Sequence, residues 1–132
     1  MRLLQVTLGF AVALVGCQRP KPSPLAAVEP VTSARIVVLS ARAGPVERIV
    51  RDTAVLRALA QLGSRDGNWH RILDTPPAGE VRAVLYRDTT YLGVVSFGPN
   101  FVGARSPRTE EYRTVEDSEL VRVRTLLSQS GA

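Results

Sequence analysis

Apolar residues recur along residues 33–132 in short runs, and turn-forming residues separate these runs. Runs rich in β-branched and aliphatic side chains are typical of strands. They predict strands at 34–42, 46–50, 81–87, 91–97, 101–105 and 111–115, the last a short edge strand. Asp88-Thr89-Thr90 lies between two of these runs and predicts a hairpin.

Two further segments repeat their apolar residues at helical spacing. The first begins after Asp52, a good N-cap residue, and Gly63 stands where a helix is expected to end. Its apolar stripe consists of Val55, Leu56, Leu59 and Leu62. The second covers 116–129, with acidic residues in its first turn and a stripe of Leu120, Val123 and Leu127.

The order of these elements is ββαβββα, which predicts a single α+β domain over residues 33–132. Connections of hairpin length favour a mainly antiparallel sheet. We expect both amphipathic helices to cover one face of that sheet and the other face to contact solvent.

The first residues follow a different pattern. Met1-Arg2 carries one positive charge, and residues 3–16 form an uncharged, mostly apolar run. As a helix this run would rise about 21 Å, less than the roughly 30 Å of a bilayer's hydrocarbon core. The length therefore disfavours a transmembrane anchor and indicates a secretory signal over residues 1–16.

Leu14-Val15-Gly16-Cys17 closes that run and resembles the signal box of bacterial envelope lipoproteins. The resemblance implies that the thiol of Cys17 carries diacylglycerol and that the signal is cut between Gly16 and Cys17. It also implies a lipid-anchored protein on the periplasmic face of the envelope. By analogy with the sorting rule of lipoproteins in enteric bacteria, Gln18 in place of Asp implies the outer membrane rather than the inner one. The competing interpretation is cleavage after Ala13, which would leave Cys17 a free thiol.

Residues 17–32 are rich in proline, with Pro20, Pro22, Pro24 and Pro30. Proline fixes φ and lacks an amide donor, so we expect an extended segment that cannot join a sheet. At about 3.1 Å per residue, this linker would hold the domain roughly 40 Å from the membrane.

The charge of the chain changes this picture only slightly. The formal net charge is +5, and Lys21 is the single lysine among 17 basic residues. Such a charge permits an anionic partner, but a protein of the envelope is not expected to bind nucleic acid.

No arrangement of residues in the sequence predicts a catalytic, metal or cofactor site. His70 is the only histidine, and with Cys17 lipidated no zinc shell can be assembled. Gly98 and Gly103 have the spacing of a phosphate loop, but Ala104 occupies its lysine position. We expect Trp69 and His70 to pack between the first helix and the sheet. Of the acids at 110, 111, 116, 117 and 119, three lie at the predicted start of a helix, which explains the group better than glycoside hydrolysis does.

The strongest functional signal is an exposed sheet face. If Ala83 and Leu85 face the helices, Arg82 and Tyr86 lie on the opposite face. That face is expected to include Arg48, Tyr91 and Arg113 on neighbouring strands.

Arginine and tyrosine are typical of protein interfaces. This composition predicts a non-enzymatic binding or adaptor module for an envelope protein or an anionic polymer. The alternative is an inhibitor of a secreted lysozyme or protease that presents the loop 74–80.

Overall fold

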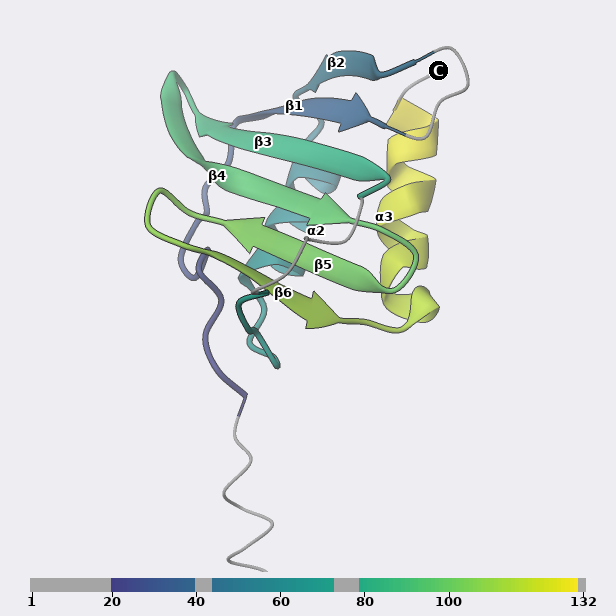
Figure 1. Cartoon of the computed structure of the whole chain (residues 1–132). Coiled ribbons are helices and arrows are strands. Elements are labelled where there is room, and N and C mark those ends of the chain that lie inside the picture. Colours follow the sequence, from purple (N-terminus) through teal and green to yellow (C-terminus); the bar gives the residue numbers. More distant parts are fainter. Residues whose placement is uncertain (1–19, 40–43, 73–78, 131–132) are drawn as a thin grey trace, which may run out of the picture.

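Six strands form one antiparallel sheet in the order β2-β1-β3-β4-β5-β6 (Figure 1). The structure is a computed structural model and describes residues 20–39, 44–72 and 79–130. The strands are β1 (Ser33–Val38), β2 (Val46–Val50), β3 (Val81–Arg87), β4 (Thr90–Phe97), β5 (Phe101–Arg105) and β6 (Glu110–Thr114). The helices α2 (Thr53–Ser64) and α3 (Asp117–Ser130) cover the same face of the sheet. The predicted ββαβββα order and the α+β class are confirmed.

The N-terminus of α2 is capped as its sequence predicts. The Asp52 carboxylate accepts hydrogen bonds from the amides of Ala54 and Val55, at 2.9 and 3.2 Å. The helix runs past Gly63 to Ser64, so this glycine does not end it. A Cβ atom at Gly63 would overlap the side chain of Val95 in β4, so the glycine lets the last turn of α2 approach the sheet closely.

Alternation along β3 separates the two faces of the sheet. Ala83 and Leu85 are fully buried beneath the helices, as expected, and Arg82 and Tyr86 point to the opposite side, called the outer face here. The largest fully buried side chains of the core are Phe97, Ile36, Leu59, Leu85, Leu120, Val95 and Val102.

The proline-rich segment is part of the domain. The backbones of Lys21 and Gly67 exchange two hydrogen bonds of 3.0 Å, and the hydroxyl of Ser23 donates to the carbonyl of Gly63. Leu25 is 3% exposed and Val28 is also buried, both within the hydrophobic core. The prediction of a free linker over 17–32 is therefore wrong for residues 20–32, which pack against the rest of the domain.

The prolines permit this packing because they alternate with residues that keep their amides. The amide of Lys21 donates to Gly67, and the amide of Leu25 donates to the Ser23 hydroxyl at 3.0 Å. Further along, the guanidinium of Arg87 donates to the carbonyls of Val28 and Pro30, at 3.0 and 2.9 Å. The segment does not pair with the main sheet, because its prolines lack amide donors. Its other residues attach it to the domain through hydrogen bonds and buried side chains.

The signal, the lipobox and Cys17 lie outside the described residues, so the lipoprotein assignment stays a prediction. Most of the loop 74–80 also lies outside them. Across the described part of the chain, no helix combines the length and the hydropathy needed to cross a membrane.

Candidate functional site

A hollow of about 470 Å³ lies on the outer face, over β3 to β6. Its described lining combines aliphatic residues, small residues and charged or hydroxyl-bearing side chains. These residues are Leu39, Gly79, Val81, Arg82, Val94, Ser96, Gly103, Ala104, Arg105, Glu110 and Tyr112. Such a mixture, with a few polar groups over an apolar floor, is typical of ligand sites.

Gly103 shapes the floor of this hollow. It pairs with Tyr112 of β6 on one side and with Ser96 of β4 on the other. A Cβ atom at Gly103 would overlap both the Tyr112 ring and the Ser96 hydroxyl. The missing side chain therefore lets the Tyr112 ring and the Ser96 hydroxyl lie close to the backbone of β5.

Charged groups surround the hydroxyl of Tyr112. The hydroxyl donates to the carboxylate of Glu110, whose other oxygen lies 3.8 Å from Nε of Arg105. Burial, followed by the hydrogen bond and the charge of Glu110, raises the pKa of Tyr112 to about 12, while Arg82 and Arg105 act in the opposite direction. Tyr112 is thus neutral at physiological pH and can donate a hydrogen bond, but it is a poor nucleophile or base.

Three of the predicted face residues lie on the outer face, as expected. Arg82 is exposed beside the hollow, and Tyr86 and Tyr91 lie further along the outer face. The two tyrosine rings meet edge to face, with centroids 6.4 Å apart and planes at 70°. Arg82 has no ion-pair partner within the part of the chain that the structure describes. Its guanidinium can therefore bind an external anion without first breaking such a pair.

The other two predicted residues, Arg48 and Arg113, lie on the opposite face, so their placement on the outer face is wrong. Arg48 pairs with Ile36, and Arg113 pairs with Val102. Both of these partners are core residues facing the helices, so the arginines face the helices too. Nη2 of Arg48 donates to the carbonyl of Leu127 in α3 at 2.5 Å.

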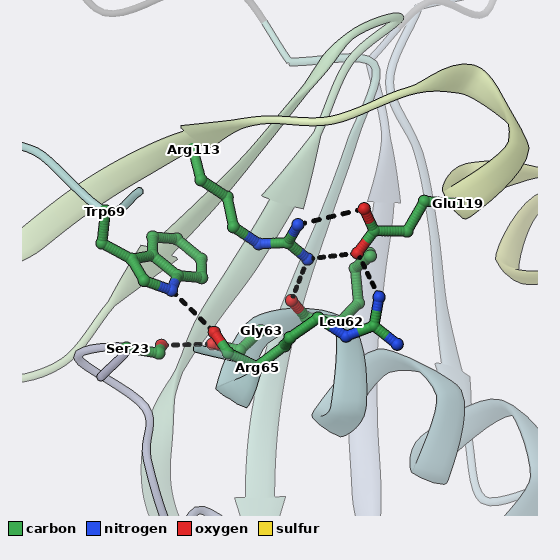
Figure 2. Close-up of polar contacts among 7 residues, drawn as sticks. All are labelled: Ser23, Leu62, Gly63, Arg65, Trp69, Arg113 and Glu119. Carbon is green, nitrogen blue, oxygen red and sulfur yellow. Dashed lines mark hydrogen bonds and ion pairs between the residues drawn. The ribbon is translucent and has the colours of Figure 1, made fainter. Parts of the chain in front are cut away.

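Figure 2 shows what Arg113 does on the helix face. Its guanidinium makes two hydrogen bonds to the Glu119 carboxylate, of 3.1 and 2.7 Å, and a third of 3.0 Å to the carbonyl of Leu62. It lies 5.4 Å from the ring centre of Trp69, whose indole donates to the carbonyl of Arg65 at 2.7 Å. Together with Ser23, these side chains satisfy carbonyls at the C-terminus of α2, which is a structural role.

Trp69 and His70 differ in their exposure to solvent. Trp69 is buried next to the end of α2, as expected. His70 is exposed, so its predicted place between helix and sheet is wrong. Its backbone instead pairs with Tyr112 along the outer edge of β6, at 2.9 and 3.0 Å.

The sequence did not single out Ser96, Arg105 or Tyr112 as site residues. A glycine inside a strand that pairs with an aromatic residue is the one signal that could have found them, because such a glycine often marks a close approach. Among the described residues, no group of three or more His, Cys, Asp or Glu side chains is arranged to hold a metal ion.

The Arg113–Glu119 pair makes the stability of the domain depend on pH. Hydrogen bonds from Arg113 lower the pKa of Glu119 below its usual 4.5, although burial acts the other way. Such a group stabilises the folded state fully above its unfolded pKa and loses this contribution as the pH falls through its folded pKa. We expect the free energy of unfolding, measured with urea, to fall as the pH decreases below about 4.5.

The control for this prediction is Glu119→Gln, which cannot ionise at this position. The variant should lose less stability than the wild type between pH 5 and pH 3, a range of about two units around the usual pKa of glutamate. Identical pH profiles for the two proteins would show that Glu119 is not responsible.

The chain matches no protein-family model, no curated protein and no solved structure. The function of the hollow must therefore be inferred from its own residues.

Proposed function

We propose that the protein is a lipid-anchored, non-enzymatic binding or adaptor module of the bacterial envelope, with the outer face of the sheet as its binding surface. The anchor would be Cys17, on the periplasmic side and preferably at the outer membrane. The partner would be an envelope protein or an anionic polymer. The observation that carries the proposal is the hollow of about 470 Å³ bordered by Arg82 and Arg105.

The chemistry of the hollow favours an anionic group on the partner. The guanidinium groups of Arg82 and Arg105 border it, against the single carboxylate of Glu110 among the described lining residues. Arginine binds carboxylates and phosphates through paired hydrogen bonds. The Tyr86–Tyr91 pair extends the same face with aromatic surface, which is enriched in protein interfaces.

Inhibition of a secreted enzyme remains the alternative. Its candidate loop, 74–80, lies outside the described residues except for Gly79 and Glu80. That idea therefore stays a prediction, to be tested by deletion of the loop.

The binding surface can be tested by partner capture with matched variants. The mature chain carrying Cys17→Ser would be immobilised through its carboxyl end and exposed to a detergent extract of the native envelope. Arg82→Glu reverses one charge at the hollow, and Tyr86→Ala removes half of the aromatic pair. The control, Arg122→Glu, makes the same charge change at an exposed position of α3, on the other side of the sheet.

We expect one component to be retained by the wild type and by Arg122→Glu. Its affinity for Arg82→Glu should be at least about tenfold lower, as is usual for an arginine at the centre of an interface. Equal retention by all variants, with unchanged unfolding curves, would reject the outer face as the binding surface.

A further inference from the structure

We propose that the domain rests directly on lipid headgroups, with the surface around Lys21, Gly67 and Asn68 turned toward the membrane. This proposal rests on the lipid anchor at Cys17. It adds an interaction surface, a contact partner and an orientation, none of which follows from the anchor alone.

The first step is that the chain binds to the folded domain from Lys21 onward, only a few residues after Cys17. Lys21 exchanges two backbone hydrogen bonds with Gly67, and Nζ of Lys21 lies 2.5 Å from the Glu111 carboxylate. Ser23 and Leu25 then continue into the core. The residues from Lys21 onward therefore cannot extend as a spacer while the domain is folded.

The second step is the length of chain that remains. Only four residue steps separate Cys17 from Lys21. Fully extended, they span at most about 14 Å. This is less than half of the roughly 35 Å diameter expected for a domain of about 110 residues. An acylated Cys17 thus holds the part of the domain around Lys21 close to the headgroups.

The third step is that this end lies at one edge of the sheet. Glu111 and the backbone of Tyr112, which pairs with His70, belong to the edge strand β6. In Figure 1 the described chain begins below β6, and β2 forms the opposite edge. Five strand spacings of about 4.8 Å separate β2 from β6 by roughly 24 Å, so β2 is the edge farther from the membrane.

The side chains around Lys21 fit a headgroup layer. The side chain of Lys21 is 55% exposed although it pairs with Glu111, and that of Arg65 is 62% exposed although it pairs with Glu119. Asp66 and Asn68, which flank Gly67, are exposed as well. The exposed large apolar residues of the described chain lie elsewhere, at Leu39, Val46, Ile49, Tyr91 and Val121. The surface therefore presents exposed polar and charged groups to the headgroup layer but lacks large apolar side chains that would insert into the acyl layer.

The lone cysteine makes the orientation measurable. Once Cys17 is acylated, a cysteine introduced at Asn68 or at Glu47 is the only free thiol of the chain. Glu47 is exposed in β2 and serves as the far control. The full chain, processed in a bacterial host, would be labelled with a fluorophore and reconstituted into phospholipid vesicles whose headgroups carry a quencher.

We expect headgroup quenching to be several-fold stronger for Asn68→Cys than for Glu47→Cys. Asp66→Cys, in the same loop, should behave like Asn68→Cys and replaces it if that variant does not fold. A flexible insertion of about 15 residues between Arg19 and Pro20 should remove most of the difference, because the domain would then move freely. Equal quenching at the near and far positions without the insertion would overturn the orientation.

Measuring the mass of the mature protein shows whether a negative result comes from a wrong orientation or from the absence of the lipid anchor. A lipid-modified Cys17 with equal quenching overturns only the proposed orientation. An unmodified Cys17 overturns the anchor and, with it, the orientation, while the capture experiment still tests the outer face.

Discussion

Glu119→Ala lowers the free energy of unfolding by about 3 kcal/mol, because it leaves the guanidinium of Arg113 without its anion. The Arg113 side chain is only 6% exposed and cannot be solvated where it lies. The loss should fall at the low end of the range for broken buried ion pairs, since Glu119 itself is 23% exposed. Urea unfolding at pH 7, compared with the wild type, measures it.

Two variants make this result specific. Glu116→Ala removes an exposed carboxylate just before the same helix and should change stability by less than about 0.5 kcal/mol. The double variant Arg113→Leu with Glu119→Leu removes both charges and should recover most of the loss. If the double variant were as unstable as the sum of its single variants, the pair would not be coupled.

Leu25→Ala destabilises the domain by about 2–5 kcal/mol, the usual range for a leucine truncated in a core. Leu25 is 3% exposed, whereas Leu39, its matched control, is 44% exposed. Leu39→Ala should therefore have a small effect. Urea unfolding of both variants decides whether the proline-rich segment belongs to the domain, and equal effects would contradict its place in the core.

The same reasoning applies to truncation. A chain that begins at residue 33 lacks both Leu25 and the hydrogen bonds from Arg87 to Val28 and Pro30. It leaves apolar core surface exposed, so it should unfold at lower urea concentration than a chain that begins at residue 20.

The sequence predicted the elements whose patterns are local and complete. Asp52 and the stripe from Val55 to Leu62 define α2, and alternation in 81–87 assigns Arg82 and Ala83 to opposite faces. The helical stripe and the strand alternation are sufficient because each repeats several times within one element, and Asp52 marks where the helix begins.

The sequence failed where a short strand or a tertiary contact decides the outcome. Five-residue strands such as β2 and β6 contain too few alternations to fix which side Arg48 and Arg113 occupy. A one-residue shift reverses every side chain of a strand. The packing of residues 20–32 was missed because proline content describes only the local backbone, whereas Leu25 is buried by residues far along the chain.

The hollow could not be predicted for a related reason. Its lining comes from β3, β4, β5 and β6, and its floor depends on Gly103 lying between Ser96 and Tyr112. Such a surface exists only once strand order and register are known.

The packing of the proline-rich segment has a consequence for how the chain folds as it emerges, amino end first. A Cβ atom at Gly93 would overlap Leu25, so Leu25 lies against a strand that is synthesised much later. Closing long loops costs more entropy than closing hairpins, so β3 to β6 can pair before residues 20–32 dock. Until then Leu25 and Val28 are exposed. Pro20, Pro22 and Pro24 remove amides just ahead of them and hinder pairing with strands of other chains during that interval.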